Sequence, residues 1–93
     1  MKEALELKPK LVAANIRKVR EFRHYTQDYL AAKLGISQNA YSKIELAYSK
    51  ITLDRLFQIA DVLEVEVIQL IAFNHAEFIR TANNTRTSAT QLI

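Results

Sequence analysis

The stretch TQDYLAAKLGISQNAYSKIE, from Thr26 to Glu45, determines the fold expected for the chain. Thr26 is a suitable N-cap, and Leu30, Ala31 and Leu34 lie at the i, i+1 and i+4 spacing of an apolar helix face. Gly35, the only glycine in 93 residues, follows directly and is expected to end that helix with a positive φ. The first half of the stretch therefore predicts a short helix that is closed by a tight turn.

A second short helix is predicted after the turn, with Ser37 as its N-cap. Its apolar positions are Ala40, Tyr41 and Ile44, and a half-buried tyrosine requires a partner for its hydroxyl. The opposite face carries polar side chains that can hydrogen-bond to base edges, namely Gln38, Asn39, Ser42 and Lys43. From the spacing alone, a helical hairpin with a solvated polar face is the commoner explanation.

The identity of the residues favours a more specific interpretation. The stretch resembles the helix-turn-helix of phage-repressor-type regulators, the Cro/cI or XRE-type family, in Thr26-Gln27, Leu30-Ala31, Gly35, Ser37-Gln38 and Ser42-Lys43-Ile44-Glu45. The resemblance extends over about residues 12 to 72. It implies an all-α, compact five-helix domain of the lambda-repressor-like type, which binds DNA and regulates transcription.

The resemblance also implies roles for individual side chains. Base edges in the major groove would be contacted by Gln38, Asn39 and Lys43. Phosphates would be contacted from around that helix, by Gln27, Ser37, Ser42, Tyr48, Ser49, Lys50 and Arg17. Arg20 and Glu45 would form a structural pair between the first helix and the second motif helix, the alternative being two unpaired surface charges.

The sequence departs from the family pattern at three positions. Ala47 and Ile51 stand where the family usually has Gly and Pro, and Tyr41 stands where Val or Ile is usual. The loop after the second motif helix is therefore expected either to be more helical at its start or to hold Ala47 in a strained conformation, at a cost of about 1 kcal/mol.

Helices are also predicted on both sides of this motif. Residues 1–8 are expected to be a frayed lead-in, and a first helix from about Pro9 to His24 has Pro9 at its first position. Its apolar stripe is Val12, Ile16 and Val19. Thr52 is expected to cap a fourth helix, whose amphipathic stripe is Leu53, Leu56, Ile59, Ala60 and Leu63.

The C-terminal part of the chain is expected to extend the domain formed by residues 9–72. A fifth helix is predicted from Val67 to about Ile79, so residues 73–80 form a helix extension. Residues 81–93 are a polar tail without periodicity, expected to be disordered unless a partner orders it.

The predicted fifth helix has more apolar side chains than one face of a small domain can bury. Exposed apolar patches usually mark an interface, so we expect a homodimer joined through Ile68, Ile71, Phe73, Phe78 and Ile79. In the alternative arrangement, Phe73 and Phe78 fold back over Val12 and Ile16 and enlarge the core.

Charge is distributed unevenly along the chain, whose net charge is +3. Residues 8–50 hold nine Lys or Arg against three acids, a local charge of +6, whereas residues 51–93 have a charge of −2. A basic front half suits a protein with one face toward phosphate, although charge alone does not establish DNA as the partner.

Other classes of site and protein are disfavoured. There is no cysteine, and His24 and His75 lack nearby ligands at metal spacing, so we expect no metal. No serine has a His–Asp arrangement and no Gly-rich phosphate loop exists, so neither an enzyme nor a cofactor is expected. No apolar run approaches the roughly 18 residues of a membrane span, and the N-terminus lacks the apolar centre of a signal peptide, so a cytoplasmic location is expected.

Together these features predict a repressor-like transcriptional regulator that binds double-stranded DNA sequence-specifically, through the helix from about Gln38 to Glu45. An antitoxin or a restriction–modification controller of the same fold remains an alternative. A helical protein-interaction module without DNA binding is a second alternative, which the presence of Gln38, Asn39 and Lys43 and the local charge of +6 disfavour.

Overall fold

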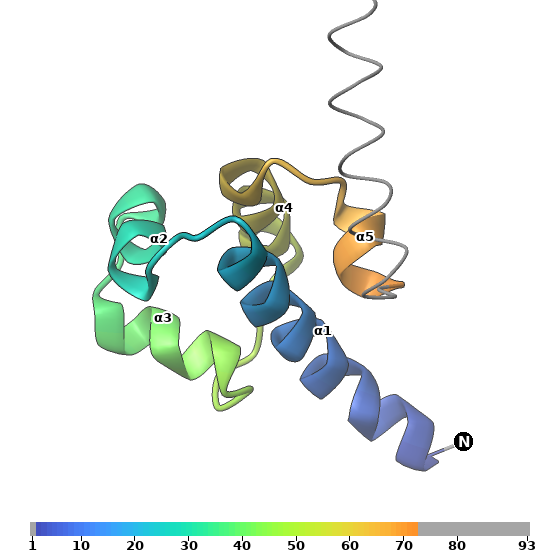
Figure 1. Cartoon of the computed structure of the whole chain (residues 1–93). Helices are drawn as coiled ribbons and strands as arrows, with labels where there is room; N and C mark the ends of the chain where they lie inside the picture. The colour runs from blue at the N-terminus through green and yellow to red at the C-terminus, as the bar shows by residue number, and fades with distance from the viewer. Residues whose placement is uncertain (1, 73–93) are drawn as a thin grey trace, which may run out of the picture.

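Five helices follow one another in the computed structural model, which describes the backbone of residues 2–72 and the side chains of residues 8–72. They are α1 (Lys2–Phe22), α2 (Gln27–Leu34), α3 (Gln38–Glu45), α4 (Leu53–Leu63) and α5 (Val67–Ile71), and no strand occurs within the described residues. Figure 1 shows α2 and α3 at one end of the molecule and α5 at the other, with α1 crossing between them. The predicted all-α fold is confirmed.

The hydrophobic core lies where α1 packs against α3, α4 and α5, and where α2 packs against α3 and α4. Its largest fully buried side chains come from all five helices, and they are Ile16, Val19, Leu30, Tyr41, Ile59, Leu63 and Leu70. The apolar stripes predicted for the first four helices supply most of these residues. Leu53 is the exception, because this predicted stripe residue is the first residue of α4 and is 66% exposed.

The start predicted for the first helix is wrong, whereas its end lies within two residues of the predicted one. α1 begins at Lys2 rather than at Pro9, so Pro9 lies inside the helix and residues 2–8 are not a frayed lead-in. Those residues, KEALELK, are all good helix formers, which accounts for the earlier start. The helix ends at Phe22 rather than at His24, because His24 has a φ of 61° and turns the chain into the link to α2.

The caps of the motif helices agree with the sequence analysis. Thr26, Ser37 and Thr52 are extended, and each hydroxyl accepts a hydrogen bond from the backbone N–H three residues later. Gly35 has the expected positive φ, at 71°. Ala47 has a φ of 59°, so the strained alternative holds for the loop after α3.

The last described helix is short and is held to the first. α5 is described from Val67 to Ile71, and the predicted helix extension and polar tail, residues 73–80 and 81–93, lie outside the described residues. The buried Asn15 side chain of α1 donates a 2.7 Å hydrogen bond to the carbonyl oxygen of Leu70. This bond joins α5 to the side of α1 that faces the core.

Candidate nucleic-acid interface

α3 has one buried face and one exposed face. Tyr41, Ile44 and Glu45 are buried, and the ring of Tyr41 is fully enclosed. The side chains predicted to contact bases, Gln38, Asn39 and Lys43, are all exposed. The helix therefore presents amide and ammonium groups to the outside while its other side is anchored in the core.

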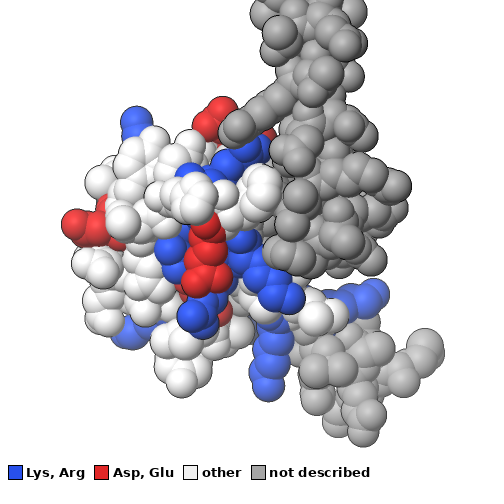
Figure 2. Space-filling view, viewed as in Figure 1, with Lys and Arg blue, Asp and Glu red and all other residues white. Residues whose placement is uncertain are grey.

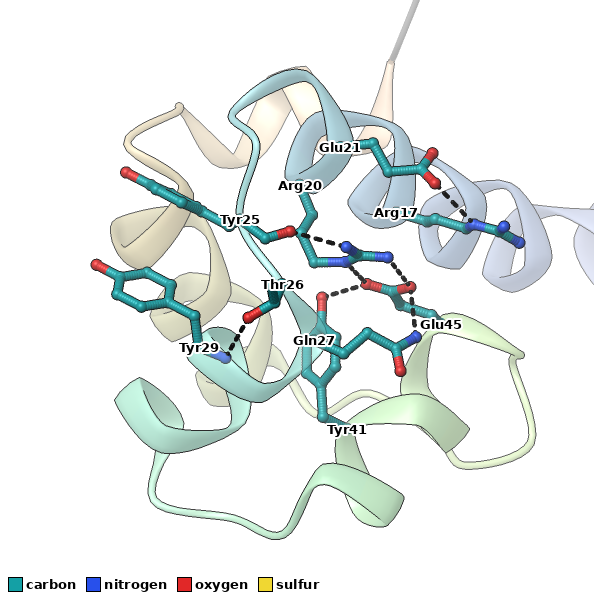
Figure 3. A network of polar contacts seen from close by, with 9 residues as sticks. All are labelled: Arg17, Arg20, Glu21, Tyr25, Thr26, Gln27, Tyr29, Tyr41 and Glu45. Carbon is teal, nitrogen blue, oxygen red and sulfur yellow. Dashed lines mark hydrogen bonds and ion pairs between the residues drawn. The ribbon is translucent and has the colours of Figure 1, made fainter.

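The anchor of α3 is an ion pair to α1, drawn in Figure 3. The guanidinium of Arg20 donates through Nε to Glu45 Oε2 at 2.6 Å and through Nη2 to Glu45 Oε1 at 3.1 Å. Its third nitrogen, Nη1, donates to the carbonyl oxygen of Tyr25 at 2.8 Å. The structure thus brings together the pair predicted from the sequence, in the two-pronged geometry that is strongest for arginine and carboxylate.

Two further donors complete the coordination of the same carboxylate. The hydroxyl of Tyr41 donates to Glu45 Oε2 at 2.5 Å, and Gln27 Nε2 donates to Glu45 Oε1 at 3.1 Å. Figure 3 shows Arg20, Gln27 and Tyr41 converging on Glu45 from three helices. We define the Glu45 cluster as these four residues, and it fixes α1, α2 and α3 relative to one another.

These contacts change the protonation behaviour of the Glu45 cluster. Burial alone raises the pKa of Glu45, but hydrogen bonds from Arg20, Tyr41 and Gln27 outweigh it, so the pKa lies below its ordinary value. Burial and the bond to Glu45 raise the pKa of Tyr41 well above its usual range. The bond to Glu45 likewise raises the pKa of Arg20. The carboxylate is therefore ionised and the tyrosine neutral at neutral pH.

Gln27 occupies a different position from the one expected for a simple phosphate contact. Its amide nitrogen is engaged with Glu45, which leaves one N–H of that amide for an outside acceptor. Ser37 is likewise engaged, as the N-cap of α3. Ser42 is half-buried on α3, and Arg17 is exposed on α1, where it pairs with Glu21 at 3.5 Å.

The loop after α3 projects polar groups beside the exposed face of the helix. Tyr48 is 77% exposed, and Ser49 and Lys50 are exposed too. The backbone N–H of Tyr48 bonds to the carbonyl oxygen of Lys43 at 2.9 Å, which closes the end of α3 through the positive φ of Ala47. The loop is therefore held directly at the C-terminal end of the helix.

Figure 2 shows how charge is distributed on the face seen in Figure 1. Lys and Arg side chains gather over α1 and along the edge below it, around acidic side-chain atoms at the centre of this face. The gathered basic side chains are those expected for a surface that approaches phosphate.

The residues predicted for dimerisation are only partly described. Ile68 and Ile71 are 63% and 51% exposed, whereas Phe73, Phe78 and Ile79 lie outside the described residues. Two large apolar side chains of α4, Leu53 and Phe57, are also exposed. The sequence analysis did not include them in an interface.

The sequence analysis missed polar contacts of the core besides that of Gln27 with Glu45. The Tyr41–Glu45 bond could have been found, because residues four apart on a helix are neighbours and both residues were already singled out. The buried Asn15 gave no such signal, since its partner is a backbone carbonyl 55 residues away.

The described residues contain neither a metal site nor a helix that could span a membrane. No group of three His, Cys, Asp or Glu side chains is positioned there to hold a metal ion. No helix within this part of the chain has the length and the apolar character that crossing a membrane would require.

Comparison with known proteins agrees with this geometry. No match was found among curated proteins or among solved structures. The family model for the helix-turn-helix domain matches residues 16–70, a segment that runs from the buried face of α1 to α5 and contains the whole Glu45 cluster. Because the match covers more than half of the chain, the protein belongs to the XRE-type helix-turn-helix family of DNA-binding domains.

Proposed function

We propose that this protein recognises specific sequences in duplex DNA and regulates transcription, with α3 lying in the major groove. The observation that carries the proposal is the pair of faces on α3: Gln38, Asn39 and Lys43 are exposed, while Glu45 is held by three other side chains. A reading helix must keep its orientation as it meets base edges, and the Glu45 cluster supplies that rigidity without using the exposed face.

The exposed side chains have the chemistry that base readout requires. An amide such as Gln38 or Asn39 can bond N6 and N7 of adenine together, and the ammonium of Lys43 can donate to O6 or N7 of guanine. Both amides lie in the first turn of α3, the end that enters the groove in helix-turn-helix proteins. We therefore assign base contacts to these three residues.

Backbone contacts would surround this helix. The free N–H of the Gln27 amide and the hydroxyls of Ser42, Tyr48 and Ser49 can donate to phosphate, and Lys50 adds a positive charge. Ser37 and Arg17 would contribute at the margins. These groups set the position of α3 on the duplex, and the bases determine which position is preferred.

Binding of a two-fold site would follow from dimerisation. One recognition helix reads only a few base pairs, whereas a symmetric dimer reads two half-sites about 34 Å apart. The exposed side chains of Ile68 and Ile71 support an interface at α5.

The test is selection of bound duplexes from a random library, followed by measurement of affinity for the selected site. Gln38→Ala or Asn39→Ala should each weaken binding to that site by about 1–3 kcal/mol and relax the sequence preference at one base pair. Gln58→Ala is the matched control, because it removes the same amide from the exposed face of α4. Unchanged affinity and preference in both α3 variants would refute the assignment of α3 to the groove.

A further inference from the structure

A groove separates the N-terminal half of α1 from the loop that follows α3. Lys8 and Pro9 line its α1 side, and Tyr48, Ser49 and Lys50 line its loop side. The rest of its lining is apolar and consists of Val12, Ala13, Ala47, Ile51, Leu56 and Ile71, and none of the described residues that line it is acidic. Lys8 and Lys50 are both exposed, and neither forms an ion pair with another described residue. Two positive charges thus border one groove without a neutralising partner in this part of the chain.

The loop side of this groove also adjoins the apolar, inward side of α3. A second, smaller hollow is lined by Ala40 and Ile44 of α3 together with Ser49 and Lys50. Lys50 therefore lies between α3 on one side and the N-terminal half of α1 on the other. On the other side, Lys8 shares its groove with Tyr48, Ser49 and Lys50, the loop residues to which phosphate contacts are assigned above.

We propose that Lys8 is a further contact to the DNA backbone, which extends the interface along the N-terminal half of α1. This inference rests on the proposed binding of duplex DNA by α3. Lys8 lies before residue 16, where the match to the helix-turn-helix domain begins, so neither the family match nor the motif assigns it a role. Because α1 begins at Lys2, Lys8 is held on a helix beside the groove and does not depend on a frayed lead-in for its position.

The expected partner follows from charge. Unneutralised ammonium groups around a groove repel one another in the free protein, and phosphates that lie between them replace this repulsion by attraction. Each phosphate that is neutralised by a lysine releases condensed counterions, and this release makes the affinity depend on salt. A backbone contact therefore has a signature that a purely structural lysine lacks.

The chain contains a matched control for Lys8. Lys10 lies on the same helix, is exposed and has the same charge, but it does not line the groove. Two residues correspond to a rotation of about 200° around a helix, so Lys10 points to the other side of α1. Removing either charge changes the net charge equally, and only the position differs.

The experiment measures binding of the full chain to fluorescent duplexes over a series of salt concentrations. One duplex carries the selected site and the other an unrelated sequence. Lys8→Gln should reduce the slope of log affinity against log salt by about 0.9, as should Lys50→Gln. Both duplexes should be weakened alike, because a phosphate contact carries no sequence information. Lys10→Gln should leave the slope unchanged.

Several results would overturn the inference. Equal slope changes in Lys8→Gln and Lys10→Gln would attribute the effect to net charge. An unchanged slope in Lys8→Gln beside a reduced one in Lys50→Gln would remove Lys8 from the interface and leave the proposed function intact. A change of sedimentation in Lys8→Gln alone would indicate that a second copy occupies the groove. If the parent chain binds neither duplex, the proposed function itself fails.

Discussion

The Glu45 cluster and the exposed apolar side chains of α4 and α5 differ in how many contacts they make with the rest of the chain. In the cluster, one carboxylate accepts hydrogen bonds from Arg20, Gln27 and Tyr41. No buried polar side-chain atom lacks a partner anywhere in the described residues. On α4 and α5, by contrast, large apolar side chains such as Phe57 and Ile68 are exposed to solvent.

This difference separates what holds the fold from what remains available for a partner. The cluster should respond most strongly to the loss of Arg20 or Glu45, because a buried charge without its partner is costly. Replacing the exposed apolar side chains should change the free energy of unfolding of one chain only slightly, because little of their surface is buried. Four predictions test this division, in order of decreasing effect on stability.

The largest effect is expected from breaking the ion pair of the Glu45 cluster. Arg20→Met or Glu45→Met alone should each lower the free energy of unfolding by about 3–5 kcal/mol, because each leaves a stranded charge. The double variant should lose much less than the sum, since no charge remains unpaired. Thermal and urea melts of the four proteins measure the coupling, and small additive losses would show that the pair does not contribute as described.

The second prediction concerns acid. The pKa of Glu45 is below its ordinary value in the folded chain, so its contribution to stability is fully present above the pKa of the unfolded chain. As the pH falls from about 4.3 to the folded pKa, this contribution to the free energy of unfolding is lost, by up to about 1.4 kcal/mol per pH unit. In melts between about pH 2 and 7, the stability of the double variant Arg20→Met/Glu45→Met should depend less on pH than that of the parent. Parallel profiles would exclude Glu45 as the titrating group.

The third prediction separates the hydroxyl of Tyr41 from its ring. Tyr41→Phe keeps the buried ring and removes one hydrogen bond to a charged acceptor, which is worth about 1.5–3 kcal/mol. Glu45 keeps its bonds from Arg20, so the loss should be smaller than that of Arg20→Met. Tyr29→Phe is the control. Tyr29 is exposed, so the melting temperature of this variant should match that of the parent. A Tyr41→Phe protein as stable as the parent would contradict the bond's contribution.

The motif between Thr26 and Glu45 could be predicted in detail from the sequence, because its signals are local. The caps at Thr26 and Ser37 and the positive φ of Gly35 each depend on a few neighbouring residues. The Arg20–Glu45 pair is not local and was inferred from the family resemblance. The start of α1 was predicted wrongly, because Pro9 was taken as a first-turn signal although good helix formers precede it.

Apart from the Arg20–Glu45 pair, contacts between distant segments could not be predicted. The Gln27–Glu45 bond depends on how α2 and α3 cross, and no spacing rule gives that angle. Exposure is equally non-local, as Leu53 and Leu56 have the same residue type on one helix, yet Leu53 is exposed and Leu56 is buried. The groove beside Lys8 likewise requires α1, the loop after α3 and α5 to be placed together.

The smallest effect on stability, and the largest on assembly, is expected at the exposed side chains of α5. Ile68→Ser and Ile71→Ser should each change the free energy of unfolding of one chain by less than about 0.5 kcal/mol, because both side chains are largely exposed. Leu70 lies between them in sequence and is fully buried, so Leu70→Ala should cost about 2–5 kcal/mol. If the chain dimerises through α5, the two Ser variants should sediment as monomers and bind a palindromic site more weakly, while retaining the folded spectrum. A parent chain that sediments as a monomer at tens of micromolar, with and without DNA, would exclude the dimer. In that case the exposed side chains of α5 do not mediate self-association. They would then differ from the Glu45 cluster only in being exposed to solvent rather than buried.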